Sequence, residues 1–179
     1  MSILKEARLG HPVIRKKARP LGAAEIASPA VKRLINDMIE TMHEYDGVGL
    51  AAPQIHMSKR IAVIEVSENP RYPDAPRIPL TILINPKVVS RSKKMVEGWE
   101  GCLSIPDLRG VVPRYESLVC EAFDRSGKAV AFEAEGFFAR VIQHECDHLD
   151  GHVYLDRMSD LLSLSYLSEF AKFGMKPRS

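Results

Sequence analysis

The sequence has few of the features that mark secreted or membrane proteins. Its three cysteines, irregularly spaced over 179 residues, do not make a disulfide framework. Its longest uncharged apolar runs, 78–84 and 161–167, are far shorter than the roughly 20 residues of a membrane-spanning helix. Lys5, Glu6 and Arg8 precede any apolar run, so we expect no secretory signal. A reducing, intracellular setting fits best, with the cysteines serving packing, catalysis or metal binding.

Net charge is also small. The formal charge of +2 argues neither for nor against nucleic acid. The apolar fraction of 45% and the charged fraction of 27% are ordinary for a soluble globular protein. No repeat, low-complexity block or clear linker divides the chain, and its length is enough to bury a core. We therefore expect residues 1–179 to form a single domain.

Hydrophobic periodicity predicts helices at three places with strands between the first two. The helices are expected at 29–44, with Ser28 as the N-cap, and at about 136–150 and 159–172. The strands are expected at 60–66, 80–84, 87–90, 94–99, 115–123 and 129–135. Residues 1–27 read as an extended arm, and prolines at every third position suit a polyproline-like loop over 70–79. This order of elements predicts an α+β fold.

The stretch with the clearest chemistry is Gln143-His144-Glu145-Cys146-Asp147-His148-Leu149-Asp150-Gly151. On a helix, residues four apart share a face, so His144 and His148 can bind one metal ion. Glu145 lies beside that pair, close enough to take a proton from a metal-bound water. Cys146 points away, roughly 200° round from His144. A bare HExxH string also occurs by chance, so the rest of the chain must support the site.

A second unusual run is Gly47-Val48-Gly49-Leu50-Ala51-Ala52-Pro53-Gln54, small and apolar with one polar side chain at its end. Its glycines allow the backbone to pass close to a ligand or to another strand. Taken alone, the run is better explained as a tight packing loop. It does not match a phosphate-binding loop, because no Lys-Ser/Thr follows.

The third metal ligand has several candidates. Glu169 lies 21 residues beyond His148, a spacing used by one class of zinc peptidases, but a solvated helix face explains it more simply. An extended HExxHxxGxxH pattern fails because Tyr154 stands at the third histidine position. His152 follows the glycine expected to stop the helix, and Cys120 lies in mid-strand like a buried thiol. These exclusions leave Cys102, flanked by Gly101 and Leu103-Ser104 rather than by a core pattern.

Three stretches together resemble the signatures of the peptide deformylases. They are GVGLAAPQ at 47–54, EGCLS at 100–104 and QHECDHLDG at 143–151, in the family's order and spacing. The likeness extends over nearly the whole chain. It implies mostly antiparallel β-sheets packed around a central HExxH helix, with one helix N-terminal and one C-terminal to them.

The resemblance implies that Cys102, His144 and His148 bind the metal, with water as the fourth ligand. Three protein ligands with one open position are typical of a catalytic site, where the metal lowers the pKa of the water. Glu145 would act as general base.

By the family model, the Gln54 side chain and the Leu103 backbone N–H would stabilise the oxyanion together with the metal. The reaction implied is hydrolysis of N-formyl-methionyl peptides to formate and a free amine.

Residues near these signatures suggest a substrate pocket. Phe137 and Val141 share the helix face of the two histidines and, with Val48 and Leu103, could floor a pocket for methionine; ordinary core packing explains them equally well. Gly49 would lie along the edge of the substrate. Arg109 stands where the family has an arginine near the peptide groove, although a plain surface arginine would need no such role.

Glu100 and Arg114 flank the cysteine loop, and we hypothesise that they pair and hold it in place.

The identity of the metal does not follow from the ligand types. One Cys and two His suit zinc, and simple affinity order disfavours Fe²⁺. The resemblance nevertheless implies one Fe²⁺ per chain, replaceable by Zn²⁺, Ni²⁺ or Co²⁺.

The implied substrate indicates the partners and the compartment. We expect nascent formylated chains as partners, and neither DNA nor membrane. The basic tail (Lys172, Lys176, Arg178) could contact the ribosome, although a solvated tail is the more frequent explanation of such a charge pattern. A bacterial cytoplasm is expected, although an organelle enzyme stripped of its targeting peptide would look the same. The rival interpretations are another HExxH metallopeptidase or amide hydrolase, and a module with a structural metal.

Overall fold

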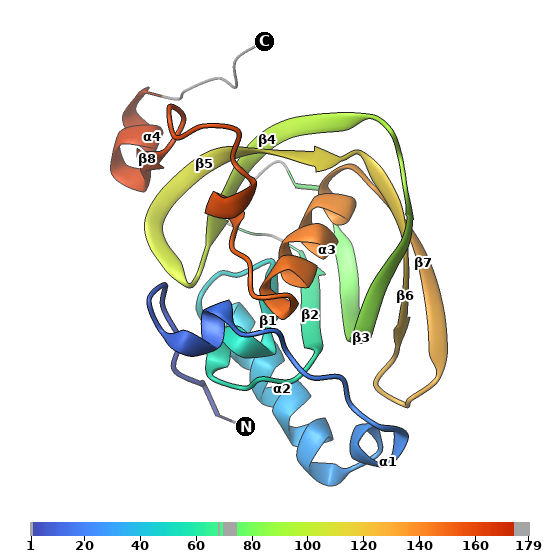
Figure 1. Cartoon of the computed structure of the whole chain (residues 1–179). Coiled ribbons are helices and arrows are strands. Elements are labelled where there is room, and N and C mark those ends of the chain that lie inside the picture. Colours follow the sequence, from blue (N-terminus) through green and yellow to red (C-terminus); the bar gives the residue numbers. More distant parts are fainter. Residues whose placement is uncertain (1, 68, 70–74, 174–179) are drawn as a thin grey trace.

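The computed structural model describes residues 2–67, 69 and 75–173 and shows an α+β fold built on antiparallel sheets, as expected (Figure 1). The helices are α1 (Ala23–Ile26), α2 (Pro29–Glu44), α3 (Gly136–Leu149) and α4 (Leu167–Phe173), with 3-10 helices η1 (Pro12–Arg15), η2 (Ala52–Ile55) and η3 (Tyr154–Arg157). The strands are β1 (Gly49–Ala51), β2 (Ile61–Val66), β3 (Ile78–Arg91), β4 (Met95–Cys102), β5 (Ile105–Tyr115), β6 (Ser117–Phe123), β7 (Ala129–Glu135) and β8 (Ser165–Tyr166). They form a five-stranded sheet, in the order β1-β2-β3-β6-β7, and a three-stranded sheet, β4-β5-β8.

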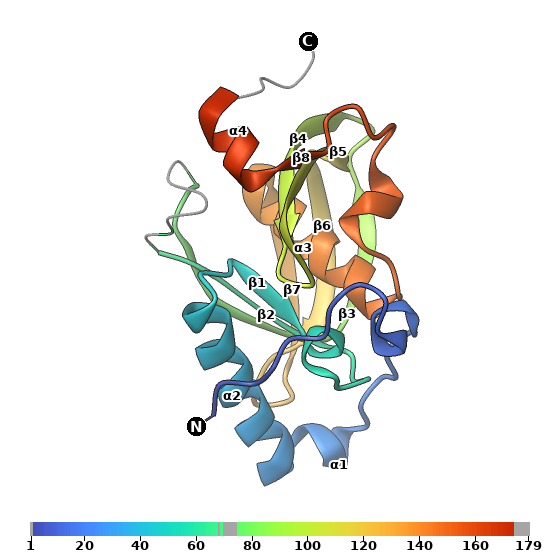
Figure 2. The same cartoon turned by 90° about the vertical axis from the view of Figure 1, so that its left-hand side faces the viewer.

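The five-stranded sheet has a hydrophobic core on each face. In β2, Ala62 and Ile64 belong to the core that includes residues of α3, whereas Ile61 and Val63 belong to the core that includes residues of α2. This alternation follows from the two-residue period of a strand. Figure 2 shows the result: α2 and α3 lie on opposite sides of β1 and β2.

The predicted helix over 29–44 is confirmed and has the expected start. The Ser28 hydroxyl accepts a hydrogen bond from the Val31 backbone N–H, and Pro29 occupies the first helical position. Ile35 and Met38, on the apolar stripe, are fully buried.

Helix α3 contacts strands of both sheets, namely β1, β2, β3, β6 and β7 of the larger sheet and β5 of the smaller one. Figure 1 shows it in orange between the curved β4–β5 ribbon and the larger sheet. Buried Ala139, Ile142 and Leu149 lie on its core-facing side. Because this helix carries HExxH, the same packing that builds the core also sets the position of the two histidines.

The N-terminal half departs from the sequence-based expectations in two ways. The arm 1–27 contains η1 and α1 as well as extended chain. The two strands expected at 80–84 and 87–90 are one strand, β3, with a register shift between Ile84 and Lys87. Asn85 lies within this register shift and has a positive φ of 53°. Of the loop expected over 70–79, residues 70–74 lie outside the described residues, and 78–79 already belong to β3.

The C-terminal half differs in two further places. Strand β5 was not expected, because Pro106, Gly110 and Pro113 interrupt its pattern. The helix expected at 159–172 is wrong over its first part, where turns and β8 stand instead, and α4 covers only Leu167–Phe173. Leu161 and Leu162, taken for an apolar stripe, are each 65% exposed.

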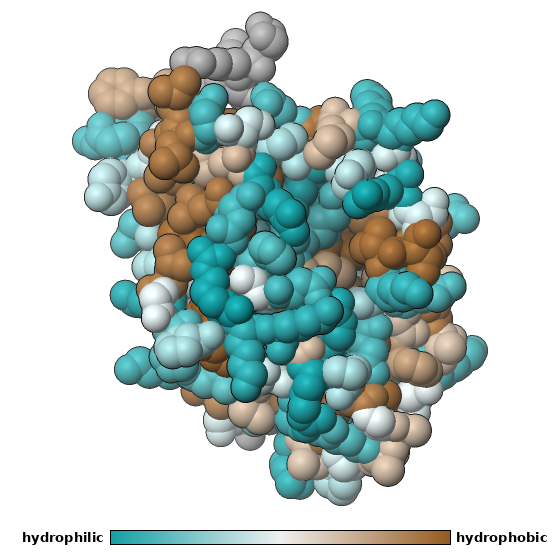
Figure 3. Space-filling view, in the orientation of Figure 1, coloured by the Kyte–Doolittle hydropathy of each residue, from teal (hydrophilic) through white to brown (hydrophobic). Residues whose placement is uncertain are grey.

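The surface has one apolar region that matches this correction. Apolar side chains gather at the upper left of Figure 3, over the segment around α4. The exposed large hydrophobic side chains of that segment are Leu161, Leu162, Tyr166, Leu167 and Phe173. Within the described residues, none of the helices has the length and apolar character needed to cross a bilayer.

Asn85 fixes the irregularity of β3 to the N-terminal arm, because its side-chain amide accepts from the Leu21 N–H (2.9 Å) and donates to the Leu21 carbonyl (2.8 Å). Asn85→Ala removes both bonds and puts alanine at a positive φ. We expect it to lower the free energy of unfolding by about 1–3 kcal/mol, measured by urea denaturation. Exposed Ser90→Ala on the same strand should change it by less than about 0.5 kcal/mol; equal effects of the two variants would contradict the role of Asn85.

Candidate metal centre

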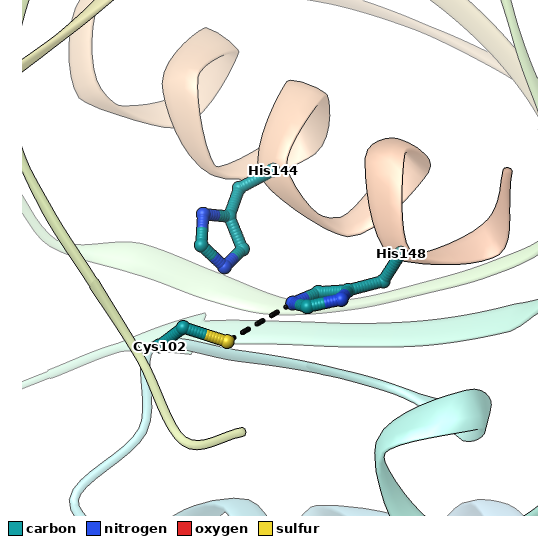
Figure 4. A group of neighbouring side chains, drawn as sticks. All are labelled: Cys102, His144 and His148. Carbon is teal, nitrogen blue, oxygen red and sulfur yellow. Dashed lines mark hydrogen bonds between the residues drawn. The ribbon is translucent and has the colours of Figure 1, made fainter. Parts of the chain in front are cut away.

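Three candidate ligands converge from two elements. Cys102 ends β4, while His144 and His148 lie one turn apart on α3, and all three point toward one another (Figure 4). The Cys102 Sγ lies 3.2 Å from the His148 Nε2, and the possible ligand atoms of the three residues all lie within 4.8 Å of one another. The fold therefore brings the three predicted ligands together, although Cys102 and His148 are 46 residues apart in sequence.

The donor set fits a divalent transition-metal ion. One thiolate sulfur and two imidazole nitrogens are the ligands that zinc and related ions take, and three protein ligands leave one position open. All three side chains are at most 11% exposed, so solvent does not compete for them. Within the described part of the chain, this is the group of three or more such donors that lie close enough to share an ion.

The charges around Cys102 favour its thiolate form. Burial opposes a charge on this sulfur, but the neighbouring His148 and His144 rings outweigh it and hold the pKa of the Cys102 thiol well below its ordinary value. A thiolate is the form that binds metal.

Glu100 orients the first histidine. Its Oε2 accepts a hydrogen bond from the His144 Nδ1 at 2.9 Å, which leaves the Nε2 of that ring to face the other two ligands. Arg114 binds the same carboxylate with two hydrogen bonds, from Nε (2.9 Å) and Nη2 (3.0 Å), so the pairing hypothesised from the sequence is present. Arg140 adds a fourth bond to Oε1 at 2.9 Å.

The Glu100 carboxylate is buried and charged. Burial opposes the charge, but His144 and Arg114 outweigh it and hold the pKa of Glu100 well below its usual range. A buried carboxylate needs this number of partners, because each lone pair left without one would cost free energy. The four hydrogen bonds supply them.

A second carboxylate, that of Asp147, ties α3 to Arg114 of β5. Asp147, on α3 itself, accepts from the Arg114 Nη1 at 2.6 Å and from Arg157 of η3. Arg114 therefore joins Glu100 of β4 to Asp147 of α3, and the ring closes through His144. This ring restrains the rotation of α3 against the β4–β5 pair.

Glu145 lines the pocket beside Cys102 and His144. Its side chain is buried, and burial raises the pKa of its carboxyl to about 7. A bound cation would favour the charged form. Its Oε2 has no hydrogen-bond partner within the described residues, so it is available to a water or to a substrate.

Gly49 explains why the run at 47–54 is rich in glycine. A Cβ built on Gly49 would collide with the Glu145 carboxylate, so only glycine lets the β1 backbone pass there. At the other end of the run, the Gln54 Oε1 accepts from the Ala51 N–H at 2.8 Å. This bond aims the Gln54 Nε2 at the Cys102 sulfur, 3.5 Å away.

A pocket of about 460 Å³, including its open mouth, begins at the ligands. The predicted residues that line it are Val48, Gly49, Gln54, Cys102, Leu103, Phe137, Val141, His144 and Glu145. Gly47, Trp99, Glu100, Gly101 and Arg140 complete the lining.

Arg109 is the predicted substrate residue outside this lining. Its side chain is buried on β5, with the guanidinium 5.5 Å from the centre of the Phe170 ring of α4. Phe170 also packs edge-on against Trp99, which does line the pocket.

The ligand candidates set aside from the sequence lie elsewhere. Cys120 and Cys146 belong to the core beneath the helix, and Glu169 is exposed and paired with Lys172. His152 follows the end of α3 and is not part of the ligand group.

Sequence reasoning missed Arg140, Asp147 and Trp99. Their signal was weak, since Asp147 and Arg140 stand beside the ligands on α3 but their partners on β4 and β5 are more than 25 residues away in sequence.

Known proteins resemble this chain in sequence and in fold over most of its length. The model of the polypeptide deformylase family matches residues 3–163. A peptide deformylase of Bordetella pertussis is 46% identical over 159 residues, 89% of each chain, and one of Nostoc sp. is 40% identical over 174 residues, covering 97% of this chain and 96% of its own. The Met-Ala-Ser-bound crystal structure of the class I type b peptide deformylase from Acinetobacter baumannii has a TM-score of 0.85 and 40% identity, covering 88% of this chain and 100% of its own.

A more distant solved structure gives the same result. The peptide deformylase of Thermotoga maritima has a TM-score of 0.79 at 35% identity, covering 89% of this chain and all of its own. The three signatures, the ligand geometry and these likenesses agree, and this chain is a member of the polypeptide deformylase family.

Proposed function

We propose that this chain is a metal-dependent peptide deformylase that hydrolyses the N-formyl group of formyl-methionyl peptides and releases formate. The observation that carries the proposal is the convergence of Cys102, His144 and His148 beside a pocket whose lining includes Cys102, His144 and Glu145. A relative of the same fold binds Met-Ala-Ser, a peptide that begins with the residue a deformylase would expose.

The residues divide the chemistry between them. Cys102, His144 and His148 would hold the ion, which when bound polarises the formyl carbonyl and lowers the pKa of water at the open position. Glu145 takes the proton of the attacking water on its carboxylate and returns it to the leaving amine.

The developing oxyanion needs donors placed beforehand. The Gln54 amide, fixed by its bond to Ala51, and the backbone N–H of Leu103 are the donors that we assign to it. Losing one such donor typically costs about 10²–10³ in rate.

The apolar part of the pocket would take the methionine side chain. Val48, Leu103, Phe137 and Val141 line it beside the ligands, and a thioether side chain packs well against such a surface. We assign Gly49 to the edge of the substrate backbone. Arg109 stays a predicted substrate contact: it lies outside the pocket lining, with its guanidinium near the Phe170 ring that packs against Trp99.

We further propose Fe²⁺ as the working metal, with Zn²⁺, Ni²⁺ or Co²⁺ able to replace it, residues 1–179 as one catalytic domain, and the bacterial cytoplasm as its location. Nascent formylated chains would be its substrates. Contact of the basic tail with the ribosome stays a prediction: Lys172 is exposed at the end of α4, and Lys176 and Arg178 lie outside the described residues.

The proposal is tested by a formate-release assay on formyl-Met-Ala-Ser, with metal analysis of the same sample. We expect formate and free Met-Ala-Ser in equal amounts, with no cleavage of internal peptide bonds. Internal cleavage without formate would instead identify a metallopeptidase, and no turnover by fully metal-loaded protein would leave only a structural metal.

Glu145→Gln should separate chemistry from folding. Removing the general base is expected to lower kcat by about 10²–10⁴-fold. Because burial already disfavours the charged carboxylate, we expect the melting temperature to be unchanged or higher and the metal content to be unchanged. The matched control is Glu133→Gln on an exposed face of β7, which should keep full activity. Activity of Glu145→Gln within a factor of two of the wild type would exclude Glu145 as the base.

Oxygen should inactivate the iron form. A Cys102 thiolate beside Fe²⁺ is open to oxidation, and a sulfinic or sulfonic product would no longer serve as this ligand. We expect protein purified in air to be less active per bound metal than protein purified anaerobically or loaded with Ni²⁺. Equal specific activity in metal-quantified preparations would refute this, and mass spectrometry of the Cys102 peptide provides the independent measurement.

A further inference from the structure

Arg140 contributes a positive charge to the wall of a pocket whose lining also holds the carboxylates of Glu100 and Glu145. It lies on α3, one turn before His144, and lines the pocket together with Phe137 and Val141. Its side chain is 11% exposed. A charge that is so little hydrated must be fully engaged by protein groups.

The guanidinium meets that requirement with carbonyls of β4 and β5, two strands of the smaller sheet. Nη1 donates to the Gly98 carbonyl (3.3 Å) and to the Val112 carbonyl (2.8 Å), two residues that face each other in the β4–β5 register. Nη2 donates to the Val96 carbonyl at 2.6 Å. The planar fork of an arginine can make these bonds together, which the point charge of a lysine cannot.

Gly98 provides the space for this arrangement. A Cβ at this position would lie 2.9 Å from both Cζ and Nη2 of Arg140. Glycine within a strand usually marks such a close approach. Gly98 and Arg140 therefore form a matched pair across the strand–helix interface.

The same guanidinium also reaches the metal site. Its Nη1 donates to the Glu100 Oε1 at 2.9 Å, and the other oxygen of that carboxylate holds the His144 Nδ1. Arg114 binds Glu100 as well, but from the side of β5 and Asp147. Arg140 therefore ties α3, which also carries His144, to the β4 segment that carries Glu100 and Trp99, both part of the pocket lining.

We propose that Arg140, with Gly98, is a positioning residue of this active site: its guanidinium fixes the 96–100 segment of β4 as the pocket wall and holds Glu100 against His144. The expected effect of Arg140 on substrate binding rests on the proposed deformylase function. Its expected effect on metal binding rests on the geometry of the ligands alone. The two effects are separable, because the carbonyl bonds set the wall and the ion pair sets the histidine.

Arg140→Met tests both effects, since methionine keeps most of the length but donates no hydrogen bond. We expect the dissociation constant for Ni²⁺, measured by competition with a chromophoric chelator, to rise about 10–100-fold, as for other groups that orient metal ligands. At saturating Ni²⁺, KM for formyl-Met-Ala-Ser should rise more than kcat falls, because Glu145 and Gln54 remain in place.

Two further variants divide the roles. Arg140→Lys keeps a positive charge near Glu100, but its side chain cannot bind the carbonyls of both β4 and β5. Its Ni²⁺ affinity should therefore be much closer to that of the wild type than the affinity of Arg140→Met, while its KM stays raised. Gly98→Ala should reproduce both effects in the wild type yet add little to Arg140→Met, a coupling that a double-mutant cycle measures. Arg19→Met, which removes an exposed ion pair with Glu25 far from the site, is the matched control and should change neither quantity.

A fall in melting temperature alone, with Ni²⁺ affinity and KM as in the wild type, would show a merely structural role and overturn the proposal. Additive effects of Gly98→Ala and Arg140→Met would overturn the pairing. If Arg140→Met does not fold, Arg140→Lys and Gly98→Ala decide the question by the same measurements. Absence of formate release by the wild type would refute the proposed function, while the change in Ni²⁺ affinity would still decide the role of Arg140.

Discussion

The buried carboxylate of Glu100 is the constraint on which the rest of the site depends. A charge at 3% exposure is stable only when every oxygen lone pair finds a donor, and here His144, Arg114 and Arg140 supply them. These donors come from α3 and β5, whereas Glu100 lies on β4. Satisfying one charge therefore fixes the helix that carries two of the proposed metal ligands against the strand that carries the third, Cys102.

The ring of charges explains how a site assembled from distant segments acquires a defined geometry. Apolar packing under α3 sets the position of the helix, but apolar contacts are not directional and do not fix its rotation. The Arg114 bridge between Glu100 and Asp147 supplies direction, because a guanidinium binds a carboxylate in a set plane. The His144 ring is then held through Nδ1 before any metal arrives, which reduces the ordering that metal binding itself must produce.

What the sequence predicted well is what local chemistry decides. The Ser28 cap, the alternation in β2 and the i, i+4 spacing of His144 and His148 each act within a few residues, and all are confirmed. Cys102 was reached by exclusion and by family resemblance, since no local rule joins it to α3. Strand β5 was missed because only pairing with β4 along its whole length outweighs its prolines. The C-terminal helix was overextended because leucines were assumed to be buried.

The contacts of Arg140 and Glu145 could not be predicted from neighbouring residues in the sequence. Two glycines nevertheless mark the places where these side chains meet a strand. Gly49 is required because the Glu145 carboxylate occupies the space of its Cβ, and Gly98 because the Arg140 guanidinium does. In both places a charged side chain of α3 lies close to a strand backbone. The glycine is there because of the side chain opposite, not because of a turn. A glycine inside a strand beside a signature motif therefore predicts where a functional side chain of another element will stand. The partner remains unknown until the fold pairs the two, because the absence of a side chain does not indicate which group fills its place.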